Sequence, residues 1–329
     1  MKRAAKTTIV PALLGGLFAV LTVVSCSKTT TKTSSDTNTA TTDTAEVSAE
    51  TTAAASPDTT AGAVTETFVT AQETAAGPAA ACAAGKTITK NTLTVATGDP
   101  AFPPYVLNDK TPEDGQGFEA AVAMAVAREL GFIPPAVKWV RTPFDAAIAP
   151  GPKDFDFNLQ QFTITPERSK VVDFSSDYYT AAQAVFGLTD SVAANAKTLA
   201  DLKGLKIGVA AGTTSLTYVE STIQPTSKVQ IYNDNAAAKV ALESKQIDAI
   251  VGDLPTALYV TNVEIKGTKV FGQIEGSGTD KFGLLLTKGS ALTECVNQAL
   301  DTLKSSGELA TITTKWMSEF TSAPVITAA

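Results

Sequence analysis

Arg168 is the first residue of this chain from which a binding chemistry can be argued. It lies in the segment QQFTITPERSKVVDFS, residues 160–175, shortly after a stretch typical of a strand. Thr165 can cap a short helix with Pro166 at its first position, which would place Arg168 in the first turn. A guanidinium there suits a carboxylate, which it can bind with two parallel hydrogen bonds. The alternative is an ordinary surface arginine paired with Glu167 or Asp173.

Two further segments carry chemistry that complements Arg168. In AAGTTSLTYVE a strand reaches Gly212, Thr213 and Thr214 and then becomes a helix, whose free N–H groups and hydroxyls suit a carboxylate. Asp253 follows the apolar strand IDAIVG, where a partly desolvated carboxylate would suit an ammonium group. Each segment also has a purely structural interpretation, as a capped turn and as a helix N-cap respectively.

Two aromatic residues are further candidates for the site. Phe102 belongs to the proline-rich loop DPAFPPYV, and Phe144 opens a short helix. Either ring could cover the side chain of a ligand or pack into a core. In open parallel sheets, ligands bind beyond the carboxyl ends of the strands. That rule adds the residues that follow two strands, Asp99 and Gln160–Gln161, to the candidate site.

The composition excludes several classes of function. The 329 residues contain no histidine, which removes histidine-based triads and metal sites. No calcium-loop, P-loop or dinucleotide-binding motif is present, so we expect neither a metal nor a cofactor. The formal net charge of −7 argues against a nucleic-acid partner, because phosphate binding needs a basic face.

The first 25 residues predict export. They combine Lys2, Arg3 and Lys6 with an apolar run that ends in VVSC, and about 16 apolar residues are too few to span a bilayer. Ser25 before Cys26 resembles a lipobox, which predicts a lipid on Cys26; a plain secretory peptide is the alternative. Residues 26–86, rich in Thr, Ala and Ser, are predicted to be a disordered tether.

Cys82 and Cys295 remain as an even pair in an exported chain. An oxidising compartment favours a disulfide between them, and two free thiols are the alternative.

From Thr92 the pattern alternates between strands and helices, which predicts parallel α/β sheets in two lobes. The expected strands are 92–98, 136–141, 153–160 and 247–253, with another inside the segment 201–221. The expected helices are 117–131, 143–151, 236–246, 291–307 and 308–320, with one after the Gly-Thr-Thr turn.

The order of LTVATGDPAFPPY, GFEAAVAMAVARELG, FTITPERSKVVDFSSDYY, LKGLKIGVAAGTT, IDAIVGD and LKSSGELATITTKW resembles the family 3 extracellular solute-binding proteins. The resemblance covers about residues 90–320. The segment APGPKDFDFNLQQ and the cysteine pair are similar to the actinobacterial branch. The resemblance implies the two-lobed type II fold of periplasmic binding proteins, with two parallel-sheet lobes joined by two hinge strands, near Ala184–Leu188 and Phe282–Leu286. It also implies lobe 1 in residues 87–186 plus 284–323 and lobe 2 in residues 187–283.

The resemblance further implies roles for single residues. Arg168 matches the arginine that binds the α-carboxylate of an amino acid, Thr213 and Thr214 match the turn that binds the same carboxylate, and Asp253 matches the acid that binds the α-ammonium. Phe102 falls where an aromatic ring commonly stacks on the ligand. Gln161 and Thr163 fall where the family often has serine or threonine, so Gln161 departs from the pattern. Asp99 falls where a cationic or polar side chain is contacted.

The implied function is that of a lipid-anchored amino-acid receptor on the outer face of the cell membrane, which closes on a polar or basic amino acid and delivers it to an ABC permease. We expect a monomer and no catalysis. The alternatives are a ligand-sensing lipoprotein that docks to a receptor, and a dehydratase of cyclic carboxylic acids on the same fold.

Overall fold

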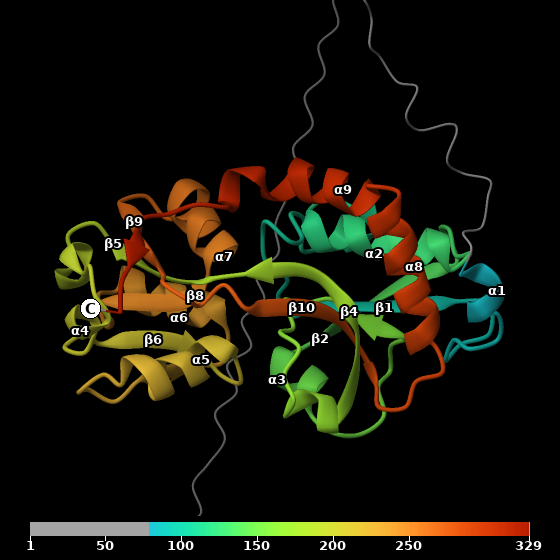
Figure 1. Ribbon diagram of the computed structural model, residues 1–329, viewed down its shortest axis with the longest axis horizontal. Helices are drawn as coiled ribbons and strands as arrows, with labels where there is room; N and C mark the ends of the chain where they lie inside the picture. The colour runs from blue at the N-terminus through green and yellow to red at the C-terminus, as the bar shows by residue number, and fades with distance from the viewer. Residues whose placement is uncertain (1–78, 329) are drawn as a thin grey trace, which may run out of the picture. The chain divides into compact units, whose positions relative to one another are not determined.

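The computed structural model describes residues 79–328, which Figure 1 shows in colour. The predicted signal peptide, Cys26 and most of the predicted tether lie outside these residues. The strands are β1 (Leu93–Gly98), β2 (Val137–Thr142), β3 (Phe157–Asn158), β4 (Val172–Ala181), β5 (Gln183–Leu188), β6 (Ile207–Ala210), β7 (Gln230–Tyr232), β8 (Ala249–Asp253), β9 (Thr268–Ile274), β10 (Asp280–Thr287) and β11 (Val325–Ile326).

The helices alternate with these strands along much of the chain. They are α1 (Ala80–Ala83), α2 (Phe118–Glu129), α3 (Phe144–Ile148), α4 (Leu199–Leu202), α5 (Thr214–Tyr218), α6 (Asn235–Glu243), α7 (Leu254–Tyr259), α8 (Thr293–Ser305) and α9 (Glu308–Met317). Short 3₁₀ turns are η1 (Pro112–Asp114), η2 (Arg168–Lys170), η3 (Val192–Asn195) and η6 (Ser318–Phe320), and π-helical turns are η4 (Val219–Ile223) and η5 (Val260–Glu264).

The strands form two sheets, ordered β2-β1-β3-β10-β4 and β11-β9-β5-β8-β6-β7. We call the first sheet with its helices lobe 1 and the second lobe 2. Both sheets are mixed rather than parallel, because β10 runs antiparallel to β3 and β4, and β5 runs antiparallel to β8 and β9. The sequence pattern missed this because β4 continues into β5, and β9 into β10, without a helix between them.

The chain changes sheets outside the predicted hinge segments. Ala184–Leu188 lies inside the second sheet, and Phe282–Leu286 lies inside the first. The changes fall instead at Ala182, between β4 and β5, and at residues 275–279, between β9 and β10. The boundaries expected after residues 186 and 283 therefore fall within strands. A third change of sheet follows β10, since β11 returns the chain to the second sheet, where it pairs with β9.

The last residues of the predicted tether are folded. Ala80–Ala83 form α1, in which Ala83 is buried, and Cys82 forms a disulfide with Cys295 of α8, with the Cα atoms 5.4 Å apart. Composition alone could not show this, because alanines serve equally well in a disordered segment and in a short packed helix.

Lobe 1 packs its longest helices on one side of its sheet. Figure 1 shows α2, α8 and α9 together on that side, and α3 on the other. Helix α2, expected over 117–131, buries Phe118, Val122 and Val126, which form an apolar stripe along one face. It stops where predicted, since Gly131 takes a left-handed conformation and Phe132 N–H bonds back to the carbonyl of Ala127 at 2.8 Å.

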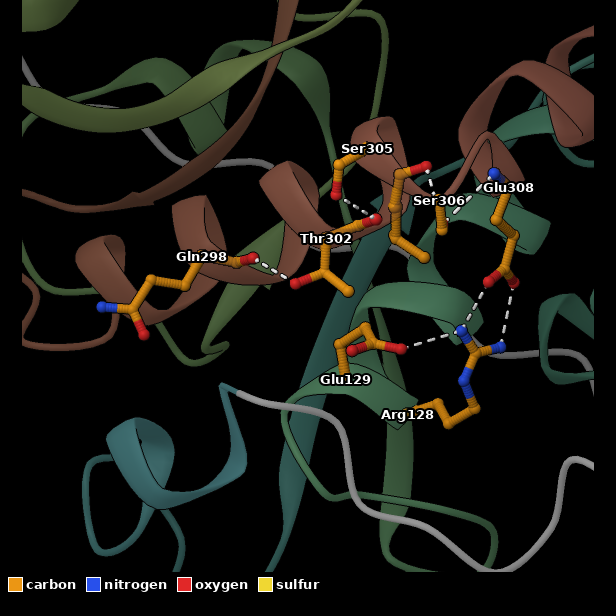
Figure 2. A network of polar contacts seen from close by, with 8 residues as sticks. Arg128, Glu129, Gln298, Thr302, Ser305, Ser306 and Glu308 are labelled. Carbon is orange, nitrogen blue, oxygen red and sulfur yellow. Dashed lines mark hydrogen bonds and ion pairs between the residues drawn. The ribbon is translucent and has the colours of Figure 1, made fainter.

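An ion pair joins two of these helices (Figure 2). Arg128 of α2 donates two hydrogen bonds to Glu308 at the start of α9, at 2.9 and 2.7 Å, and one to its neighbour Glu129 at 3.0 Å. Such a paired fork has geometric specificity that a single contact lacks. It therefore fixes the C-terminal end of α2 against α9.

Lobe 2 is a sheet covered on both sides. One cluster of buried side chains packs α6 and α7 on the sheet, and another packs α5 and η4 on it. Strands β6 and β8 are fully apolar and buried up to Ala210 and Gly252, so their carboxyl ends deliver Gly212 and Asp253 to one edge. Within residues 79–328, no helix has both the length and the apolar character needed to cross a bilayer.

Candidate binding cleft

A cavity of about 460 Å³ lies where loops of both lobes meet. Nine of the ten predicted ligand-binding residues line it: Asp99, Phe102, Phe144, Gln161, Thr163, Arg168, Thr213, Thr214 and Asp253. The tenth, Gly212, contributes a carbonyl oxygen that accepts a hydrogen bond from Arg168. The structure thus brings together residues that are up to 154 positions apart in the sequence, from Asp99 to Asp253.

Arg168 lies between the lobes rather than in a surface ion pair. Its Nη1 donates to the carbonyl of Thr163 at 2.8 Å, and its Nη2 donates to the carbonyl of Gly212, in lobe 2, at 2.9 Å. Its main-chain N–H bonds to Thr165 Oγ1 at 3.2 Å, which is the predicted capping contact. Burial lowers the pKa of Arg168 below its ordinary value, although a guanidinium stays charged at neutral pH.

The Gly-Thr-Thr turn performs a structural role and also faces the cavity. Gly212 has φ +71°, a conformation that side chains rarely adopt. The hydroxyl of Thr213 donates to Ala210 O at 2.8 Å and accepts from Leu216 N–H at 3.1 Å, so it caps α5. The hydroxyl of Thr214 does not cap the helix. It lies 3.3 Å from the hydroxyl of Thr163 in lobe 1.

Asp253 occupies the N-cap position of α7, but its side chain makes no capping hydrogen bond. Its Oδ1 accepts instead from Gln183 Nε2 at 3.0 Å, and the same nitrogen donates to Asp280 Oδ2 at 2.6 Å. Burial raises the pKa of Asp253 to about 7, with a further contribution from the charge of Asp280. Sequence reasoning missed Gln183 and Asp280, because neither follows a recognisable strand-to-helix junction.

The two aromatic residues have different surroundings. Phe144 stacks on the buried Phe162, with ring centroids 5.0 Å apart, and the guanidinium of Arg168 lies 5.4 Å from its centroid. Phe102 has the ammonium of Lys239, from lobe 2, 5.4 Å from its centroid. Both rings line the cavity, and Phe144 also packs against a cluster of buried side chains in lobe 1.

Gln161 is fixed by hydrogen bonds to the buried carboxyl group of Glu119. Its main-chain N–H donates to Glu119 Oε1 at 2.7 Å, its side-chain amide donates to the other oxygen, and Tyr178 O–H also donates to Glu119. Gln161 has φ +51°, so these contacts fix it in a left-handed conformation. Burial raises the pKa of Glu119 to about 7. Glu119 therefore shapes the loop that carries Gln161 and Thr163.

The charged residues of the cavity lining are mostly acidic. Its carboxylates are Asp99, Asp145, Asp234 and Asp253, while Arg168 is the one cation among the lining residues. Asp145 and Asp234 were not predicted. The strand-end rule could have found Asp234, since it follows β7 in the segment YNDN. Within residues 79–328, no group of acidic or cysteine side chains has the arrangement of a metal site.

Comparison with known proteins identifies relatives over the whole of this region. The family described as bacterial extracellular solute-binding proteins, family 3, matches residues 93–319. An L-arginine-binding protein of Pseudomonas aeruginosa is 33% identical over 235 residues, which cover 66% of this chain and 85% of the relative. The L-cystine-binding protein TcyJ of Escherichia coli is 30% identical over 220 residues, covering 65% and 79%.

Solved structures are similar in both sequence and fold. An ancestral arginine-binding protein bound to glutamine has 35% identity and a TM-score of 0.60, over 69% of this chain and 98% of that one. The ancestral amino acid-binding protein AncCDT-1, a precursor of cyclohexadienyl dehydratase, has 31% identity and a TM-score of 0.57, over 69% and 95%. These neighbours confirm the predicted two-lobed type II fold. By sequence and by fold, this chain belongs to family 3 of the bacterial extracellular solute-binding proteins.

Proposed function

We propose that the cleft binds an amino acid with a cationic side chain, and that the protein delivers it to the permease of an ABC importer. The observation that carries this proposal is the lining of the cavity: two lobes contribute to it, and its carboxylates outnumber its single guanidinium. A zwitterion with an additional positive charge is the amino-acid form that such a lining attracts most strongly.

The α-groups of the ligand would be held at opposite sides of the cavity. Arg168, which still has unused donors, would bind the α-carboxylate together with the turn of Gly212, Thr213 and Thr214. Asp253 would bind the α-ammonium. A ligand that contacts both lobes binds the closed form better than the open form, and this difference in affinity drives closure.

The cationic side chain would extend toward the remaining carboxylates. Asp99 is exposed and makes no hydrogen bond or ion pair within the described residues, so its charge is available to a ligand. The names of several relatives point in the same direction, since two of those cited above are named for arginine. Phe102 and Phe144 would pack on the aliphatic part of the side chain.

The cellular setting that we propose follows the leader sequence. The chain would be exported by residues 1–25, anchored by a lipid on Cys26 and held by the Thr/Ala/Ser-rich tether as a monomer near its permease. A sensor that docks to a receptor would share the same cleft, and deletion of the gene for this protein separates the two roles: uptake of radiolabelled ligand stops only if this protein serves transport.

The ligand class is tested by calorimetric titration of the purified protein with each of the twenty L-amino acids. We expect L-arginine or L-lysine to bind most tightly, and Asp99→Asn to weaken L-arginine by about tenfold, the value of one lost charge contact at roughly 1.4 kcal/mol. Glu113→Gln, which removes an exposed charge outside the cavity, is the matched control. Tighter binding of L-glutamate, or turnover of a prephenate-like substrate, would contradict the proposal.

A further inference from the structure

The carboxyl groups of Asp253 and Asp280 lie on either side of the Gln183 amide, where the chain changes sheets. Of the two, only Asp253 was expected to contact the ligand. Gln183 is the first residue of β5, directly after the change at Ala182, and Asp280 is the first residue of β10, directly after the loop 275–279. Asp253 ends β8 and lines the cavity, whereas Asp280 does not line it. Asp253 and Asp280, joined through Gln183, thus connect the binding cleft to two of the three connections between the sheets, at Ala182 and at residues 275–279.

One neutral amide serves both carboxylates. Gln183 Nε2 donates to Asp253 Oδ1 at 3.0 Å and to Asp280 Oδ2 at 2.6 Å. Ser215 Oγ donates to the side-chain oxygen of Gln183, Oε1, at 2.6 Å. This contact fixes the side-chain amide with its nitrogen toward the two acids. Gln183 and Ser215 are both buried. The Thr214 hydroxyl supplies one more donor to Asp280, at 3.3 Å.

No ion pair within residues 79–328 neutralises either acid. Arg168 is the nearby cation, but its two hydrogen bonds go to carbonyl oxygens. The titratable and charged groups that face Asp253 from all packed elements are Arg168, Asp280, Glu119, Tyr105, Tyr178 and Tyr179. The pKa of each of these tyrosines is raised by burial, so their phenols are neutral between pH 6 and pH 8.

We propose that Asp253 and Asp280 hold one proton between them until an amino acid binds, and that the ammonium group of the ligand displaces this proton. Asp280 is then a positioning residue: it touches no ligand, but its charge decides how readily Asp253 gives up its proton. The inference rests on the proposed function, because it assumes that Asp253 receives the ammonium.

The physical basis is repulsion between like charges in a partly dehydrated site. Two neighbouring carboxylates with one neutral donor between them cannot both ionise at low cost. Burial and the charge of Asp280 together raise the pKa of Asp253 to about 7, and burial also raises that of Asp280. When the ammonium arrives, the carboxylic O–H bond breaks, its proton passes to the buffer, and the new carboxylate accepts hydrogen bonds from the ligand.

The test is calorimetric titration of the wild-type protein with L-arginine at pH 6, 7 and 8, in phosphate and in Tris, whose enthalpies of ionisation differ widely. Binding that displaces a proton from a group with a pKa near 7 releases about half a proton at pH 7 and weakens about tenfold from pH 8 to pH 6. Heats that are equal in both buffers, with an affinity that does not change with pH, would overturn the inference while leaving the proposed function intact. Absence of any amino-acid binding would defeat both.

The variant Asp280→Asn tests whether the charge of Asp280 controls the proton release. Asparagine keeps an oxygen that can accept from Gln183 and Thr214 but carries no charge. We expect less proton release at pH 7 and a shift of the affinity profile to lower pH by about one unit. Asp177→Asn, on the neighbouring strand β4, removes a surface carboxylate beside Lys281 and should behave as the wild type. Unchanged proton release in Asp280→Asn would overturn the inference by assigning the proton to another group, such as Glu119.

Discussion

Arg168 shows how one side chain can serve both architecture and binding. It joins the lobes through the carbonyl oxygens of Thr163 and Gly212, and it faces the cavity with donors to spare. Most residues found from the sequence share a property: they stand just after a strand or in the first turn of a helix. Gln183 and Asp280 lack this signature, since they begin strands, and only the folded chain brings them beside Asp253.

Arg168→Ala should weaken amino-acid binding by about 3–5 kcal/mol, roughly 10²- to 5 × 10³-fold, because the α-carboxylate would be left in the cleft without its charged partner. Calorimetric titration measures this loss. Lys170→Ala, two residues away in η2 and exposed, is the matched control and should retain the wild-type affinity. Equal affinities in both variants would remove Arg168 from the site.

Glu119 makes a separate prediction about stability and pH. Its pKa is raised from an ordinary value of 4.5 to about 7 by burial, so the folded protein retains this proton at pH values where the unfolded chain has lost it. The free energy of unfolding therefore falls as the pH rises from about 4.5 to about 7, and Glu119 adds no further change above that range.

In Glu119→Gln this contribution to the pH dependence is absent. The decrease in unfolding free energy between pH 5 and pH 8 should be smaller than in the wild type, by on the order of 1–3 kcal/mol. Urea unfolding at the two pH values measures it. Parallel pH profiles for the wild type and the variant would show that Glu119 does not titrate in this range.

At the scale of elements, the sequence indicated the helices better than the sheets. Helix α2 was predicted almost to the residue, because an apolar stripe and Gly131 mark its length and its end. The antiparallel pairings of β4, β5 and β10 were not predicted, because alternation of strands and helices carries no information about strands that follow each other directly. The third change of sheet, to β11, leaves no pattern beyond two apolar residues.

The link between α1 and α8 should stabilise lobe 1 without affecting the cleft. Replacing Cys82 and Cys295 together by serine should lower the free energy of unfolding by about 2–4 kcal/mol, since the reduced unfolded chain regains the freedom that the bridge removes. No residue of α1 or α8 lines the cavity, so the affinity for L-arginine should stay within about twofold. Denaturant titration and calorimetry measure the two quantities. A variant that loses binding while it remains folded would contradict this separation.

For the whole molecule, the essential feature is that neither lobe holds the complete site. Lobe 1 supplies Arg168 and the aromatic rings, lobe 2 supplies Asp253 and the Gly-Thr-Thr turn, and the hydroxyls of Thr163 and Thr214 face each other across the boundary at 3.3 Å. The family to which the chain belongs could be identified from the order of its segments. The full acidic character of the lining could not, because Asp145 reaches the cavity only through the packing of the folded chain, whereas Asp234 follows a strand end and could have been found.

Small-angle X-ray scattering of the purified protein, with and without saturating L-arginine, tests this account most directly, and L-glutamate serves as the control ligand. A cationic amino acid that contacts both lobes should shift the population toward the closed form and reduce the radius of gyration, whereas L-glutamate should not change it. Scattering curves that coincide with and without L-arginine, or compaction by L-glutamate alone, would contradict the account.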